Sequence, residues 1–233
     1  MKLLALDTAS GLCSAALYVD GEVMLRETPT TREHARLVLP MVQSLLAEAQ
    51  WSMVQLDAIA FGRGPGSFTG LRVAAGLTQG LAFGAGLPVL PVSDLRALAQ
   101  QAAALAPAGT PLLACMDARM HELYWALYEA PLAGQWVSDT AEQLCTPVQL
   151  TQRLGVAAAG SAQWRGAGMG LAVWLASEAA PPLNPALLLP AAEPSAREIA
   201  LLGAVDWSAG KAQPPEAAVP VYLRDDVARP SAQ

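Results

Sequence analysis

The chain has 233 residues, of which 53% are hydrophobic and 15% charged, so it can bury a core and is not typical of a disordered protein. Its net charge is −6 and its 14 Lys and Arg residues are scattered singly, which argues against a strong, direct nucleic-acid binder. The three cysteines form no C-x-x-C pair and indicate free thiols in a reducing compartment. The apolar start ends at Asp7, too early for a signal peptide, and no clean run of about 20 apolar residues follows. We therefore expect a cytoplasmic protein without a membrane segment.

The first half of the chain alternates predicted strands and helices. Asp20-Gly21 predicts a tight hairpin between two strands, because this dipeptide suits a two-residue turn. Thr30 and Glu33 have the spacing of a capping box and predict the start of a helix. The predicted elements are strands at 3–6, 13–19 and 22–27, a helix at 31–50, a strand at 56–61, a helix at 67–84, a strand at 88–92, and a helix from Ser93 to 104.

A linker is predicted at 106–110, after which the pattern restarts. Strands are predicted at 112–116, 122–128, 135–138 and 156–159, with a helix capped by Thr146 before the last of these, a loop at 183–194, and a helix from Ser195 to 207. The repeated order suggests two copies of one α/β unit. We expect an N-terminal lobe of residues 1–105, completed by the segment 195–233, and a C-terminal lobe of residues 106–194.

Two polar or Gly-rich turns could carry chemistry. Asp7, Thr8 and Ser10 follow the first strand, where a carboxylate and hydroxyls could meet a metal or phosphate, although a plain polar turn explains them as well. Gly64 and Gly66 lie in the turn 62–70 before a helix, a setting in which backbone amides can cradle phosphate. The turn lacks the Lys of a P-loop and fits neither the dinucleotide pattern nor a nucleophile elbow. These five residues are therefore weak candidates for nucleotide contact.

The helix after this turn carries glycine at every fourth position, at Gly76, Gly80 and Gly84. Glycine in a helix interior costs about 1 kcal/mol relative to alanine. Three glycines on one face suggest close packing, either on the chain's own sheet or against a partner helix. In both cases we expect Gly80→Leu to disrupt that packing.

The only histidines, His34 and His121, have no neighbouring ligands at metal-binding spacing, and no serine stands in a nucleophile context. We accordingly predict no catalytic residue, no metal and no cofactor.

Several segments together resemble the TsaB family, over residues 3 to 228. The most specific is GRGPGSFTGLR; the others are LALDTAS, CSAAL with its DG hairpin, HARLVLPMV, DARM-HELY and PVYLRDDVA. The resemblance implies two RNase H-like lobes of the actin/Hsp70/sugar-kinase type. It also implies a non-catalytic subunit that binds and activates TsaD, the transferase that adds the threonylcarbamoyl group to adenosine 37 of certain tRNAs.

The resemblance further implies that the metal site of TsaD is missing here. The ligand histidines of TsaD would fall on Asp94 and Leu98, and leucine cannot bind a metal. The implied partners are TsaD, contacted through the first two long helices, and TsaE in a larger complex. A homodimer is implied when the chain is alone, and contact with tRNA is only indirect. The candidate interface residues are Leu37, Met41, Leu45, Leu71, Ala75, Gly76 and Gly80.

Two other readings remain open from the residues themselves. The chain could be an enzyme, either an ATPase that uses Asp7, Thr8 and the turn 62–70, or a peptidase acting on TsaD, for which no nucleophile is evident. It could also be a plain homodimeric scaffold.

Overall fold

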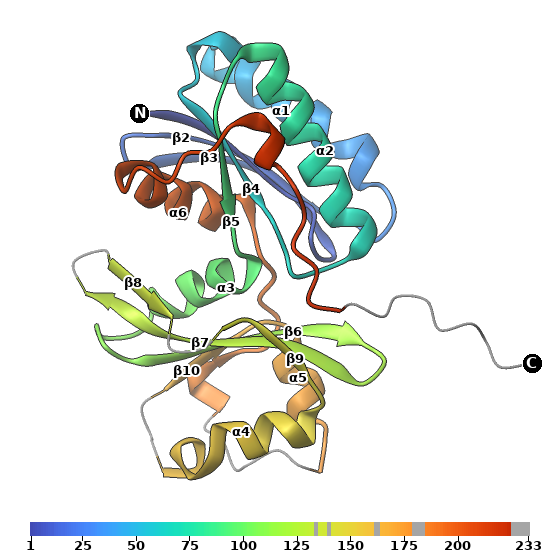
Figure 1. The fold of residues 1–233 in the computed structure, drawn as a ribbon, viewed down its shortest axis with the longest axis vertical. Helices are drawn as coiled ribbons and strands as arrows, with labels where there is room; N and C mark the ends of the chain where they lie inside the picture. The colour runs from blue at the N-terminus through green and yellow to red at the C-terminus, as the bar shows by residue number, and fades with distance from the viewer. Residues whose placement is uncertain (133–134, 139–140, 161–163, 179–184, 225–233) are drawn as a thin grey trace, which may run out of the picture.

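The computed structural model describes residues 1–132, 135–138, 141–160, 164–178 and 185–224. Figure 1 shows two α/β lobes, one above the other, each built around a mixed sheet. Within the described ranges, the helices are too short or too polar to cross a membrane.

The upper lobe is built on a five-stranded sheet in the order β3-β2-β1-β4-β5. Its strands are β1 (Lys2–Asp7), β2 (Leu12–Val19), β3 (Glu22–Pro29), β4 (Ala58–Gly62) and β5 (Val89–Val92). The first three are antiparallel neighbours, whereas β4 pairs parallel with both β1 and β5. Side chains alternate along β1, so that Leu4 and Leu6 face one hydrophobic core while Leu3 and Ala5 face another.

Helices cover both faces of this sheet (Figure 1). The helices α1 (His34–Ala49) and α2 (Phe68–Ala85) pack on one face, with the short helices η1 (Met53–Gln55) and η3 (Pro215–Ala217) at their edges. Helix α6 (Ala196–Ser208) packs on the other face. The chain thus returns to the upper lobe after it has built the lower one.

The lower lobe repeats this arrangement. Its strands are β6 (Pro111–Arg119), β7 (Glu122–Leu132), β8 (Gln135–Ser138), β9 (Gln143–Cys145), β10 (Arg165–Ala167) and β11 (Leu188–Leu189), in the order β11-β10-β6-β7-β8, with β9 also paired to β7. As in the upper lobe, the first two strands, β6 and β7, are antiparallel. The sheet continues beyond β6 with the parallel strands β10 and β11. This duplication confirms the predicted fold, an α/β protein with two lobes of the actin/Hsp70/sugar-kinase type.

Helices also cover both faces of the second sheet. Helix α3 (Asp94–Ala103) follows β5 but packs its buried leucines mainly against the lower sheet, between the two lobes. Helices α4 (Pro147–Gly160) and α5 (Gly170–Leu175) enclose a core on the opposite face, and the short helix η2 (Pro185–Leu187) precedes β11. Because α3 joins the two lobes by packing, they share buried apolar surface near the junction.

Helix starts follow local capping chemistry. Ser67 and Ser93 each accept a hydrogen bond from a backbone amide three residues later, as expected of N-cap residues. Thr146 and Gln149 form the predicted reciprocal capping box. Thr30 is different: its hydroxyl accepts from the Glu33 amide, but α1 begins only at His34, so the predicted start at residue 31 is too early.

Two predictions near the end of the lower lobe are wrong. Residues 156–159 form part of α4 rather than a strand, since this alanine-rich stretch favours helix. The strand at this stage is β10 at 165–167, which was not predicted. The predicted loop at 183–194 includes η2 and β11, with residues 183–184 lying outside the described part of the chain.

Candidate functional site

The two sequence segments singled out as polar or Gly-rich turns lie against each other. The Thr8 hydroxyl donates to the Gly70 carbonyl at 2.7 Å, and the Ser67 amide donates to the Ala9 carbonyl at 2.7 Å. A side chain at Gly70 would collide with the Thr8 carbonyl. Glycine is therefore required here because two stretches of backbone meet, which leaves no room for phosphate between them.

Asp7 and Asp94 form a buried carboxyl pair beside this turn. Both side chains are fully buried, and the Asp94 carboxyl also accepts a hydrogen bond from the Gly64 amide. Burial first, and then the nearby Asp7, raise the pKa of Asp94 well above its ordinary value, and burial also raises the pKa of Asp7. We read the pair as a neutral Asp94 acid that donates to the Asp7 carboxylate.

At the two positions where the resemblance places metal ligands, the side chains take part in packing and backbone hydrogen bonding instead. Asp94 holds the Gly64 amide, and Leu98 is fully buried in the core beneath α3. Among the described residues, no group of three or more His, Cys, Asp or Glu side chains could hold a metal ion.

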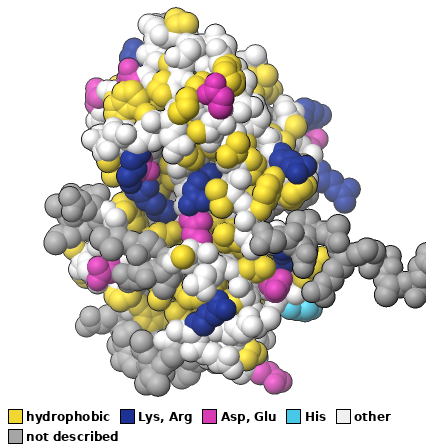
Figure 2. Space-filling view, viewed as in Figure 1, with side chains coloured by type: hydrophobic (Ala, Val, Ile, Leu, Met, Phe, Trp, Pro, Cys, Tyr) yellow, Lys and Arg dark blue, Asp and Glu magenta, His cyan; other side chains and the backbone are white. Residues whose placement is uncertain are grey.

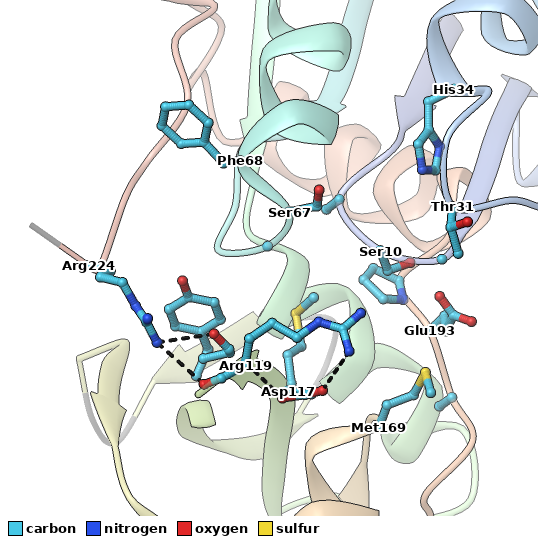
Figure 3. Close-up of a pocket in the computed structure, with 18 of the residues that line it drawn as sticks. Ser10, Thr31, His34, Ser67, Phe68, Asp117, Arg119, Met169, Glu193 and Arg224 are labelled. Carbon is cyan, nitrogen blue, oxygen red and sulfur yellow. Dashed lines mark hydrogen bonds and ion pairs between the residues drawn. The ribbon is translucent and has the colours of Figure 1, made fainter. Parts of the chain in front are cut away.

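A pocket of about 420 Å³ lies between the lobes (Figure 3). The upper lobe contributes the predicted candidates Ser10 and Gly66, whereas Asp7, Thr8 and Gly64 do not line the pocket. The other polar and aromatic lining residues come from the starts of α1 and α2 in the upper lobe, from the lower lobe, and from the segments before and after α6: Thr31, His34, Ser67, Phe68, Asp117, Arg119, Tyr124, Glu193, Tyr222 and Arg224. Of the five residues predicted to contact a nucleotide, three are therefore packed in the interior and two line an open cavity.

The charges of the pocket are only partly compensated. Asp117 and Arg119 pair with each other at 3.2 Å, and Arg224 pairs with Glu122 just outside. Burial lowers the pKa of His34, although Asp7 and Glu193 act in the opposite direction, so this imidazole is neutral near pH 7. Glu193 has no ion-pair partner within the described ranges.

The C-terminal tail, residues 218–224, connects the two lobes at the mouth of the pocket. The Val221 amide donates to the Arg63 carbonyl at 2.7 Å, and the Tyr222 ring lies 5.2 Å from the Phe68 ring, both contacts being with the upper lobe. Arg224 then donates to the Ala118 carbonyl of the lower lobe at 3.1 Å. The tail accordingly fixes the position of the pocket wall.

Ion pairs also join elements at the junction, where Figure 2 shows basic and acidic side chains gathered between the lobes. Arg63 pairs with Glu142 at 2.9 Å, and Arg96 on α3 pairs with Asp206 on α6 at 2.6 Å. These four side chains are largely shielded from solvent, so they hold α3 and the turn 62–70 in place.

The candidate interface residues fall into two groups. Gly76 and Gly80, with Gly84, lie on the exposed face of α2, where an added Cβ would meet nothing within 4 Å apart from its own turn of the helix, among the described residues. Packing against the chain's own sheet is therefore not their purpose, and the expectation that Gly80→Leu disrupts such packing is wrong. Leu37 and Met41 are half-buried on α1.

The other three candidates, Leu45, Leu71 and Ala75, lie in the chain's own core. They offer no surface to a partner in this structure, so the proposed contact surface leaves them out. Helical spacing shows that residues share one face of a helix but not whether that face is exposed or buried. Only the packing of the helix on the sheet decides this.

Most of the pocket residues, among them Glu193, Arg119, Tyr222 and Arg224, were not predicted from the sequence. These four lie at a strand end, in an interlobe segment and in the tail, where residue spacing carries no signal. Arg119, Tyr222 and Arg224 lie in the segments DARM and VYLR, which carry part of the family resemblance.

The duplicated sheets, the buried acid at the end of β1 and the turn packed against it define a two-lobed protein related to TsaD. Residues 28–230 match the family described as "TsaD: tRNA N6-adenosine threonylcarbamoyltransferase". The chain is 40% identical over 231 residues to the tRNA threonylcarbamoyladenosine biosynthesis protein TsaB of Escherichia coli K12, covering 98% of this chain and 96% of that protein.

Two further relatives agree with this match. The TsaB protein of Haemophilus influenzae is 44% identical over 161 residues, which cover 66% of this chain and 68% of that protein. The structure of YeaZ from Pseudomonas aeruginosa is 40% identical in sequence, with a TM-score of 0.83 over 95% of this chain and 99% of that one. The chain belongs to the TsaB family.

Proposed function

We propose that this chain is a non-catalytic subunit that binds and activates a TsaD transferase in the cytoplasm, for the threonylcarbamoylation of adenosine 37 of tRNA. The relatives are named for the biosynthesis of threonylcarbamoyladenosine, and the matching family is that of the transferase. TsaE joins the larger complex, tRNA is contacted only indirectly, and the TsaD-binding face forms a homodimer when the chain is alone.

The exposed glycines of α2 carry this proposal. Each glycine costs about 1 kcal/mol of helix stability relative to alanine, and nothing in the described chain packs into the space beside Gly76, Gly80 and Gly84. Such a face allows another helix backbone to approach closely. Phe83, which is 53% exposed on the same helix, adds apolar surface to this contact face.

The non-catalytic role is supported by the residues that stand where a nucleotide or metal site would be expected. Asp7 and Asp94 are buried next to each other, and the Thr8 hydroxyl donates to the Gly70 carbonyl. The same contacts argue against the alternatives, an ATPase or a peptidase. Isothermal titration with ATP and Mg²⁺ tests the ATPase: tight binding that Ser10→Ala abolishes would favour an enzyme.

Reconstitution tests the proposed role directly. TsaD, TsaE and a supply of threonylcarbamoyl-adenylate should form little modified tRNA until this chain is added. Full synthesis without it would refute the proposal.

The contact face has its own test, in which two effects have opposite signs. Gly80→Ala should stabilise the monomer by about 1 kcal/mol, measured at a concentration low enough to dissociate a homodimer, because alanine is the better helix former and has room. The same substitution should weaken co-purification with TsaD, and Gly80→Leu should weaken it further. Ala172→Leu, at an exposed position on α5 of the lower lobe, is the matched control for added bulk. Unchanged pairing of both Gly80 variants would remove this face of α2 from the interface.

A further inference from the structure

Glu193 presents a carboxylate to the interlobe pocket without a counter-ion. Its Oε2 is buried, and among the described residues it has no hydrogen-bond partner. The segment itself is held in place, since the Glu193 carbonyl accepts from the Gln101 side chain at 2.7 Å. A carboxylate at the wall of a pocket without a counter-ion can pair with a positively charged donor from outside the chain.

His34 lies along the same wall of the pocket. The residue is only 7% exposed, and its buried Nδ1 has no partner within the described ranges. Figure 3 shows His34, Thr31 and Glu193 one above the other on this wall. Since burial lowers the pKa of His34, the ring is neutral and one of its nitrogens can accept a hydrogen bond. The wall therefore offers a carboxylate, a hydroxyl and an imidazole, and no cation.

These groups select the charge of a ligand. A triphosphate would bring its negative charges toward Glu193 and Asp117. The two arginines that line the pocket, Arg119 and Arg224, are already paired with Asp117 and Glu122. A positively charged hydrogen-bond donor satisfies Glu193 instead. The cavity of about 420 Å³ has the size of a small-molecule site.

The geometry points to a binding site for a small organic ammonium compound, whose –NH₃⁺ group pairs with the Glu193 carboxylate, with Thr31 and His34 beside it. Two sources share this chemistry, a free amino acid and a polyamine. In an amino acid the carboxylate would lie toward Arg119, which lines the pocket from the lower lobe. This site is separate from the exposed face of α2 and does not depend on the proposed partner.

Titration of the full chain tests the site. Calorimetry and ligand-observed NMR with the proteinogenic amino acids, putrescine and spermidine, up to about 10 mM, should identify at least one binder. Its N-acetylated form should not bind. An amino acid as the binder and a polyamine as the binder both support the ammonium site, and together they identify the source.

Glu193→Gln should weaken that binding at least about tenfold, because it keeps the shape and removes the charge. Glu216→Gln, which makes the same change at an exposed position outside the pocket, should change it less than about twofold. A circular dichroism spectrum checks the fold of each variant. Gly11→Ala is a second probe, since its Cβ would lie 3.2 Å from Glu193 Oε2 and crowd the site. Lack of binding by every amine, equal binding of the acetylated form, or full binding by a folded Glu193→Gln would overturn the inference.

Discussion

The carboxyl groups of Asp7 and Asp94 lie next to each other in the interior, Asp7 at the end of the first strand and Asp94 at the start of the helix that joins the lobes. Both are fully buried, and the pKa of each is raised. Asp94 also fixes the Gly64 amide, so the pair connects β1, the turn 62–70 and α3. Two adjacent carboxyl groups can act as a catalytic pair in an enzyme, whereas in this chain they hold three structural elements together.

Asp94→Asn should stabilise the chain at pH 7 and above. The pKa of Asp94 is higher in the folded chain than its ordinary value of 3.8, so protonated Asp94 stabilises the fold. This contribution is fully present below about pH 3.8 and is lost as the pH rises through the pKa of the folded chain. Asparagine keeps an oxygen for Gly64 and donates to Asp7 at every pH, so we expect a gain on the order of 1 kcal/mol at pH 8. Urea unfolding at about pH 5 and pH 8 measures this, and destabilisation at pH 8 would show that Asp94 is not the protonated partner.

Gly62→Ala should destabilise the chain by about 1–3 kcal/mol. A Cβ at this position would collide with the side chains of both Asp7 and Asp94, which are enclosed and cannot move away. Gly76→Ala is the matched control, because its Cβ enters open space and should stabilise the chain by about 1 kcal/mol. Thermal unfolding compares the two, and equal effects would contradict the packing described around Gly62.

Arg224→Ala should loosen the tip of the β6–β7 hairpin. Arg119, Met120 and His121 all have positive φ, a conformation that costs on the order of 1 kcal/mol each. Arg224 donates to the Ala118 carbonyl and pairs with Glu122, on either side of that tip.

Hydrogen exchange of the amides of residues 119–122 should therefore become at least about fivefold faster in Arg224→Ala. Arg36→Ala, at an exposed arginine on α1, should leave that exchange unchanged. Unaltered exchange in Arg224→Ala would mean that the hairpin holds its conformation without the tail.

The three cysteines should not react in the native protein at pH 8. Cys13, Cys115 and Cys145 are all buried. Burial raises the pKa of Cys13 to about 11, and it also raises the pKa values of the other two thiols, so almost no thiolate is present. Titration with a thiol-specific chromogenic reagent should show no rapid reaction until denaturant is added, and then three thiols. A rapid native reaction would show that one cysteine becomes exposed by local opening.

Local chemistry in the sequence determined most elements of the fold. Alternating apolar residues, Asp20-Gly21 and the capping residues Ser67, Ser93 and Thr146 place strands, a hairpin and helix starts, because these signals act within a few residues. The same local signals failed at 156–159, where an apolar stretch suits a strand as well as a buried helix, and its alanines decide for helix.

Only the tertiary structure decided what the glycines and the acids do. Gly70 and Gly80 are alike in sequence terms, yet one meets the Thr8 carbonyl and the other faces open space. Glu193 and Arg119 are distant along the chain and line one pocket only when the lobes stack. Contacts between segments far apart in sequence depend on how the sheets and helices pack, and residue spacing does not predict that packing.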